Sequence, residues 1–292
     1  KIDFSFQKTP KKNSGYFFAL RFLYIKYEKQ NIMTRLISFG CSWTFGVGLS
    51  WEPDITYEEF KATKKQEDVA NKYSFRALLA KEFGLENINH AVGGSSNQRQ
   101  FRVAEKFDFK KDDIVLWGIT STARNEIWVD TEGDYKKIFY SQAAKCDESD
   151  DFCKLMKMTV KHWHNHEEEV KRIFYRMKHY NDYFKCKGVK VLWYDTLNHH
   201  NYQQVPDNML YGNEDHRDLL SRLCKINGYT NLRDRYHFSI GKSKTKKFVD
   251  CGRIDFISKN GIANPFSGHP TKAGHRQIAD MMRPFIISVL QS

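Results

Sequence analysis

A serine at the end of a strand and a histidine ahead of the last helix are the residues of this sequence best suited to chemistry. Ser42 follows the β-rich run 35–39 and Gly40, at a point where a helix would begin. The N–H groups and the dipole of a helix N-terminus favour negative charge that develops there. Because serine is a poor nucleophile at its own pKa, it needs a base within hydrogen-bond reach. His269 is the best candidate for that base.

The pattern around Ser42 also allows simpler interpretations. Serine is favoured as a helix cap in any α/β protein, so Ser42 could serve only in that way. Cys41, its neighbour, is a rival nucleophile, because a thiol at a helix N-terminus has a lowered pKa. His269 could be a loop histidine without a catalytic role.

Strands and helices alternate along the chain. The run 112–119 is nearly continuous in apolar residues, as a buried parallel strand should be. Apolar runs and helical spacing predict strands at 35–39, 86–92, 112–119 and 189–194, and helices at 73–83, 98–107, 160–185 and 271–290. This order predicts a three-layer α/β/α sandwich with a doubly wound parallel sheet of the flavodoxin-like type. The carboxyl ends of its strands lie along one edge, where the turns that follow them can converge.

The 292 residues suffice for one large domain, which we expect to span residues 33–292. Residues 1–32 carry seven Lys and Arg against two acidic residues and are expected to be a basic, aromatic appendage. Polar residues at 50–70 predict a loop. The segments 130–160 and 198–262 show little periodicity, and we interpret them as insertions, the second as a cap or as substrate-facing loops.

Charge and cysteine content limit the possible partners and setting. The net charge is +12, but no long basic run occurs, so a generally basic surface is favoured over a nucleic-acid interface. Six cysteines without CxxC pairs favour reduced thiols in a cytoplasm over a disulfide framework or a zinc site built from cysteine. The apolar stretch 15–25 is too short for a membrane span and contains Arg21. The oligomeric state is left open.

Three motifs resemble the conserved blocks of the SGNH/GDSL hydrolases, in the same order. Gly40-Cys-Ser-Trp-Thr44 resembles the first block, Asn89-His-Ala-Val-Gly-Gly-Ser95 the second and Ser267-Gly-His-Pro-Thr-Lys-Ala-Gly-His275 the last. The resemblance covers roughly residue 33 to the C-terminus. It implies that Ser42 is the nucleophile, that His269 is the base, and that the backbone amides of Ser42 and Gly94 stabilise the oxyanion.

The sequence departs from this family pattern at three places. Cys41 replaces the aspartate of the first block. In the third block, Thr120 takes the place of the oxyanion asparagine, a change that costs on the order of 3 kcal/mol of transition-state stabilisation unless Asn97 or Asn125 substitutes. The acid that precedes the histidine is missing. Asp255 could orient His269 only if the loop folds back, so the orienting acid is unassigned.

Two further groups of residues are candidates for binding roles. Arg124, just beyond the third strand, could support the oxyanion or hold a substrate carboxylate, phosphate or sugar, and a structural salt bridge is the alternative. His162 and His166 share a helix face, but one such pair without a carboxylate is a weak metal site. His275 is expected to pack or cap within the last helix.

The resemblance thus implies a serine esterase or deacylase that hydrolyses a small-molecule, lipid or glycan ester through an acyl-enzyme on Ser42. Such chemistry requires neither a metal nor an organic cofactor. The alternative is a catalytically weakened module of the same fold that binds carbohydrate or a protein partner.

Overall fold

The computed structural model describes residues 33–292 except 53, 130–132, 144–146, 148, 198–199, 203, 213, 215–216 and 228–268. The predicted appendage at residues 1–32, Asp255 and most of the predicted insertion at 198–262 therefore lie outside the described residues.

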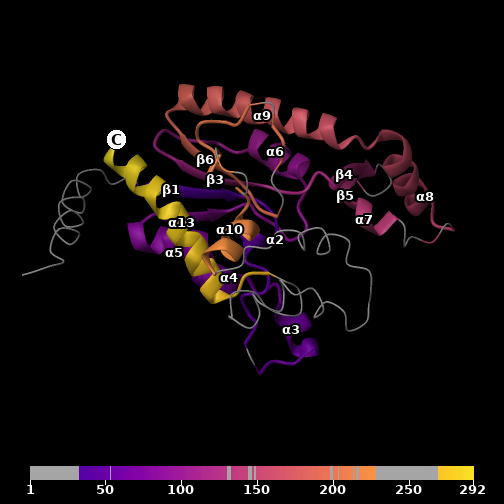
Figure 1. The fold of residues 1–292 in the computed structure, drawn as a ribbon, viewed down its shortest axis with the longest axis horizontal. Coiled ribbons are helices and arrows are strands. Elements are labelled where there is room, and N and C mark those ends of the chain that lie inside the picture. Colours follow the sequence, from indigo (N-terminus) through magenta and orange to yellow (C-terminus); the bar gives the residue numbers. More distant parts are fainter. Residues whose placement is uncertain are drawn as a thin grey trace, which may run out of the picture.

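Four parallel strands form the central sheet (Figure 1). In the order in which they lie side by side, they are β2 (Glu86–Asn89), β1 (Arg35–Phe39), β3 (Ile114–Ile119) and β6 (Lys190–Asp195). The chain passes from β1 to β2 on one side and then returns to β3 on the other. Open α/β sheets bind ligands at such a switch point, outside the carboxyl ends of the strands. The predicted fold class is confirmed, and the switch point lies at the ends of β1 and β3.

Side chains of alternate strand residues form two cores, one on each face of the sheet. Leu36 and Leu116 belong to one core, whereas Ile37 and Trp117 belong to the other. This alternation follows from the two-residue period of a strand, and the continuous apolar run of β3 reflects burial on both faces.

Helices cover both faces and complete the three layers (Figure 1). Residues of α5 (Phe75–Phe83), α10 (Leu219–Ile226) and α13 (Lys272–Gln291) pack into the core that contains Leu36. Residues of α6 (Asn97–Glu105) and α9 (His166–Lys187) pack into the core that contains Ile37. The four predicted helices are thus present, and α13 continues past Pro284 to Gln291.

The expectation of a loop at residues 50–70 was wrong. The polar segment 50–70 contains α3 (Tyr57–Thr63) and most of the neighbouring α4 (Glu67–Tyr73). Each of these helices buries a single side chain, so neither shows apolar periodicity. The sequence nevertheless contains a signal for the start of α3, because Thr56 and Glu59 form a capping box.

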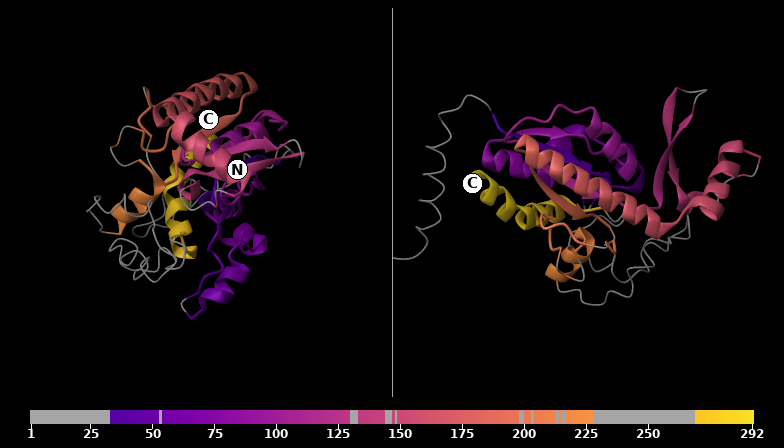
Figure 2. Two further views of the ribbon diagram at one scale, coloured as in Figure 1. Left: turned by 90° about the vertical axis from the view of Figure 1, so that its right-hand side faces the viewer. Right: turned by 90° about the horizontal axis from the view of Figure 1, so that it is seen from above.

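The segment that follows β3 includes the region 130–160, which we interpreted from the sequence as an insertion. A hairpin of β4 (Arg124–Val129) and β5 (Asp134–Phe139) leads into α7 (Tyr140–Ala143), α8 (Asp151–Met158) and the π-helix η1 (Thr159–Trp163). These elements, which we call the arm, extend beyond the end of the sheet (Figure 2, right). The arm has its own small core, which includes Ile138 and Met156. Few of its side chains are buried, which explains why its apolar pattern was weak.

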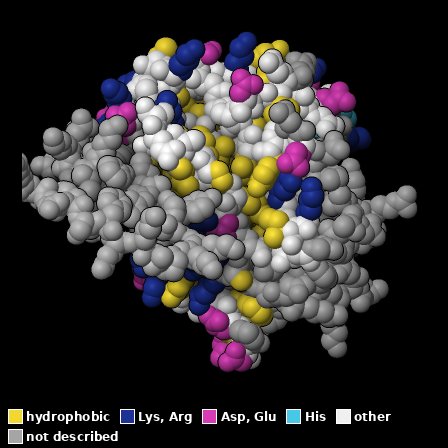
Figure 3. All heavy atoms as spheres, turned by 60° about the vertical axis from the view of Figure 1, so that its left-hand side comes forward, with side chains coloured by type: hydrophobic (Ala, Val, Ile, Leu, Met, Phe, Trp, Pro, Cys, Tyr) yellow, Lys and Arg dark blue, Asp and Glu magenta, His cyan; other side chains and the backbone are white. Residues whose placement is uncertain are grey.

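The expectation of reduced thiols holds for only part of the chain. Cys41 and Cys186 are free, but Cys153 of α8 is disulfide-bonded. Across the described segments, no helix is both long and apolar enough to cross a membrane. On the face shown in Figure 3, basic side chains are dispersed among acidic ones and form no continuous patch.

Candidate active site

The turn after β1 holds Ser42 at the start of the short helix α2 (Ser42–Phe45), with Cys41 as the N-cap. Gly40 is required at this turn, because a Cβ there would overlap the side chain of Thr44. Ser42 is 5% exposed. As the first residue of a helix, it has an amide without an intrahelical acceptor. The turn therefore offers a hydroxyl and a free N–H donor at the switch point.

The Gly93-Gly94 turn after β2 lies directly against the Ser42 turn. The Val92 amide donates a hydrogen bond to the Gly40 carbonyl (3.3 Å), and a Cβ on Gly93 would contact Val47 at 3.4 Å. Gly94 has φ +72°, a conformation that glycine adopts without strain. Phe139 of the arm covers this glycine, since a Cβ on Gly94 would lie 2.8 Å from the end of its ring.

Thr120, at the carboxyl end of β3, is held from several sides. Its amide donates to Asn97 Oδ1 and its carbonyl accepts from Asn97 Nδ2, both at 2.9 Å. Its hydroxyl accepts a hydrogen bond from an Arg124 Nη atom (3.0 Å), and His200 Nε2 lies 3.1 Å from its carbonyl. The structure thus places Asn97 and Arg124 at Thr120. Asn125 instead donates to the Tyr140 hydroxyl within the arm (2.8 Å).

Cys41 connects the first turn to the third. Its thiol is fully buried and donates to the Thr196 hydroxyl (3.7 Å). Burial acts to raise the pKa of Cys41, but the Arg124 charge, the Trp43 amide and the hydroxyls of Thr196 and Thr120 outweigh it and lower the pKa. The turns after β1, β3 and β6 therefore meet around one buried thiol. That burial also keeps Cys41 from reaching a substrate in this conformation.

His269 lies just before α13, whose N-terminus is capped by Thr271. Burial, Arg76 and His269 together lower the pKa of His275 to about 3, which places His269 near the first turn of α13. His275 stacks on Phe75 and accepts its amide hydrogen bond (3.3 Å), so it packs within the helix as expected.

Both the Ser42 turn and the first turn of α13 lie against residues 74–75 at the start of α5. A Cβ on Gly46, at the end of α2, would lie 3.3 Å from Ser74, next to Phe75. The structure thus brings Ser42, Gly94 and Thr120 together and sets His269, ahead of α13, near the same edge.

Sequence analysis missed a buried polar network at the end of β6. Asp195 is fully buried and accepts hydrogen bonds from the His200 amide (3.1 Å), the Tyr202 hydroxyl (2.9 Å) and Arg217 Nε (3.3 Å). Burial raises the pKa of Asp195 to about 7, although these three partners act to lower it. His200 links the network to Thr120, and burial lowers its pKa to about 4. In the sequence, an aspartate at the end of an apolar strand was the feature that could have indicated this network.

The raised pKa of Asp195 predicts a pH dependence of stability. The folded protein holds this proton more tightly than the unfolded chain, whose carboxyl has the ordinary pKa of 3.8. The stabilisation is complete below pH 4 and is lost as the pH rises to about 7, by up to about 1.4 kcal/mol per pH unit. Urea unfolding between pH 4 and 8 should show this slope in the wild type and not in Asp195→Asn. The exposed Asp207→Asn should keep it, and an equal slope in Asp195→Asn would contradict the assignment.

The described residues hold no cluster of three or more His, Cys, Asp or Glu side chains that would suit a metal. His166, considered above as half of a metal pair, instead hydrogen-bonds the Thr122 hydroxyl through Nδ1 (2.7 Å).

Comparison with known proteins gives matches only among solved structures. No family model matches the sequence, and no curated protein matches it. The chain is similar to a G-D-S-L family protein. That structure, from Desulfitobacterium hafniense DCB-2, has 11% identity and a TM-score of 0.36, and the match covers 86% of this chain and 98% of the other.

Two other solved structures have comparable scores. A carbohydrate esterase, whose active site is described as having divergent catalytic and non-catalytic binding functions, has 12% identity and a TM-score of 0.40, with 87% of this chain and 69% of the other covered. Phospholipase A1 from Streptomyces albidoflavus NA297 has 12% identity and a TM-score of 0.36, with 87% and 99% covered.

Proposed function

We propose that this protein is a serine esterase or deacylase with Ser42 as its nucleophile. The observation that carries the proposal is the convergence of the Ser42, Gly94 and Thr120 turns at the switch point of the sheet. Ser42 and Gly94 each present a backbone amide with no backbone acceptor among the described residues. Two such donors beside a serine hydroxyl are what an acyl-transfer site needs to stabilise a tetrahedral oxyanion.

In the proposed reaction, Ser42 Oγ attacks the ester carbonyl carbon while His269 accepts the hydroxyl proton. The negative charge that develops on the carbonyl oxygen is stabilised by the amides of Ser42 and Gly94. Thr120 serves as the third donor through its hydroxyl, which accepts a hydrogen bond from Arg124. His269 then returns the proton to the leaving alcohol, and water hydrolyses the acyl-enzyme to release the acid.

The proton transfer requires the His269 ring and the Ser42 hydroxyl to lie within hydrogen-bond distance of each other in the substrate complex. Catalytic hydrogen bonds that are long in the free enzyme often form only when substrate is bound. The orienting acid for His269 stays unassigned, since Asp255 lies outside the described residues.

The substrate in this proposal is a small-molecule or glycan ester, a class also hydrolysed by the carbohydrate esterase reported above. A non-catalytic binding module is the second candidate. It is favoured by the Phe139 ring that covers Gly94. The two candidates differ in whether an ester is cleaved.

Replacement of His269 by glutamine tests the catalytic proposal. Loss of the general base should lower kcat for 4-nitrophenyl acetate hydrolysis by about a hundredfold or more. His179→Gln, an exposed replacement on α9, is the matched control and should retain wild-type kcat. If the wild type cleaves the ester and His269→Gln does so equally well, His269 is not the base. If the wild type cleaves no ester, the binding module becomes the better account.

A further inference from the structure

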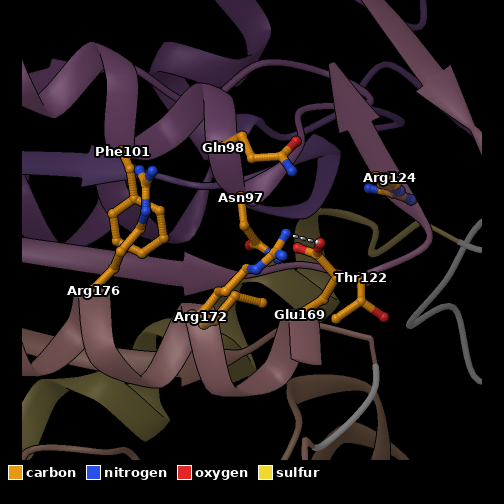
Figure 4. A pocket seen from close by; sticks show the side chains of 9 residues that line it. Asn97, Gln98, Phe101, Thr122, Arg124, Glu169, Arg172 and Arg176 are labelled. Carbon is orange, nitrogen blue, oxygen red and sulfur yellow. Dashed lines mark hydrogen bonds and ion pairs between the residues drawn. The ribbon is translucent and has the colours of Figure 1, made fainter. Parts of the chain in front are cut away.

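A small pocket beside Thr120 has a strongly basic lining. Its volume is about 120 Å³, and it lies between α6, α9 and the start of β4 (Figure 4). Three arginines line it, Arg124, Arg172 and Arg176, against one acidic residue, Glu169. Phe101 contributes an apolar wall. The lining therefore carries an excess of two positive charges.

Arg124 is the arginine of this pocket nearest to the proposed oxyanion site. Its guanidinium donates to the Thr120 hydroxyl (3.0 Å), and no carboxylate among the described residues forms an ion pair with it. By contrast, Arg35 is paired with Asp113, and Arg102 is paired with Glu126. A guanidinium has five N–H donors, so Arg124 keeps donors for an anion that enters the pocket.

Arg172 and Arg176 lie on α9 at the other side of the pocket (Figure 4). Arg172 pairs with Glu169 (3.0 Å), one turn earlier on the helix. Arg176 stacks over the Phe101 ring, 5.2 Å from its centroid, and lies 3.7 Å from Glu105. The stacking fixes the guanidinium plane at the pocket wall, and a single distant carboxylate leaves most of its donors free.

The other side of the proposed site is also basic. Lys137 of β5 donates to the Gly93 carbonyl (3.1 Å), and Arg99 donates to the His90 carbonyl (3.0 Å). Burial lowers the pKa of Lys137, and the charges of Arg99 and Lys65 lower it further. The groups around Gly94 thus repel one another, and a bound anion would relieve that repulsion.

We propose that the arginine pocket binds an anionic group, a carboxylate or a phosphate, carried by the ester substrate. This inference rests on the proposed function, because it assigns the pocket to the same substrate that Ser42 attacks. Asn97, the first residue of α6, also lines the pocket, so the pocket lies beside the first turn of that helix. The volume suits a small charged group and excludes a long acyl chain.

Three acetyl esters with the same leaving-group frame test the proposal: phenyl acetate, 4-acetoxybenzoate and 4-acetoxyphenyl phosphate. The wild type should prefer the two anionic esters. Arg124→Gln and Arg176→Gln should each lower the anionic-to-neutral ratio of kcat/KM by about tenfold or more. The anionic ester with the higher kcat/KM in the wild type shows whether the pocket prefers a carboxylate or a phosphate. Arg276→Gln, an exposed replacement on α13, should leave the ratio unchanged. A ratio unchanged in both pocket variants would overturn the proposal.

Calorimetric binding of benzoate and of inorganic phosphate separates this proposal from the proposed function. If no ester is cleaved, but both pocket variants weaken anion binding about tenfold, the pocket is supported and the esterase is not. If esters are cleaved and neither anion binds the wild type, the esterase stands and the pocket assignment fails. Arg176 has a half-exposed side chain, so its replacement keeps the test open should Arg124→Gln not fold. Melting curves establish that each variant is folded.

Discussion

Ser42→Ala is expected to lower kcat/KM for ester hydrolysis by about a thousandfold or more, because removal of a catalytic serine leaves only oxyanion and binding contributions. The alanine variant should fold normally. Ser42 makes no side-chain hydrogen bond to another described residue, and its replacement removes a single oxygen atom. Initial rates with 4-nitrophenyl acetate, measured with unfolding curves for both proteins, give the comparison.

Ser288→Ala is the matched control for this replacement. Ser288 is an exposed residue of α13 whose hydroxyl bonds only the Phe285 carbonyl (2.8 Å). The control should hydrolyse the ester at the wild-type rate. A Ser42→Ala protein that retains more than about a tenth of the wild-type kcat/KM would show that another group carries out the reaction.

Gly40→Ala is expected to destabilise the protein by about 3 kcal/mol or more, at the upper end of the cost of overpacking. The added methyl group would overlap Thr44, whose Cβ lies 2.5 Å from the position of the new atom. Thr44 is fully buried, and its hydroxyl shares a hydrogen bond with the Tyr194 hydroxyl (2.8 Å), so it cannot swing away. Urea unfolding measures the loss, and any hydrolytic activity should fall with it.

Gly84→Ala separates the effect of overlap from that of backbone strain. Gly84 ends α5 with φ +65°, and no atom lies within 4 Å of the position of an added Cβ. Its replacement should cost only the strain of a left-handed residue, about 1 to 2 kcal/mol. If Gly40→Ala costs no more than Gly84→Ala, the turn is more adaptable than the structure indicates.

The sheet could be predicted from sequence because its strands are buried on both faces. Leu116 and Trp117 face opposite cores, so the sequence of β3 is a continuous apolar run. Three parallel strands that end in small polar residues then suffice to predict one crevice. The arm could not be predicted in this way, since it packs around a small separate core that includes Ile138.

The site could be predicted in part. The positions of Ser42, Gly94 and Thr120 follow from topology, since each residue follows a strand of one parallel sheet. The roles of Asn97 and Asn125 could not be separated by sequence. Asn97, the first residue of α6, pairs with Thr120, whereas Asn125 belongs to a hairpin whose register the sequence does not specify. The network at Asp195 depends on contacts between residues 195, 200, 202 and 217, which no local pattern specifies.

The most direct test of Ser42 as nucleophile is covalent labelling with a fluorophosphonate, which phosphonylates an activated serine with loss of fluoride. After digestion, mass spectrometry of the wild-type protein should find the adduct on the peptide that contains Ser42. Labelling should be lost in Ser42→Ala and strongly slowed in His269→Gln. A wild-type protein that stays unmodified, or an adduct on any other residue, would contradict the assignment.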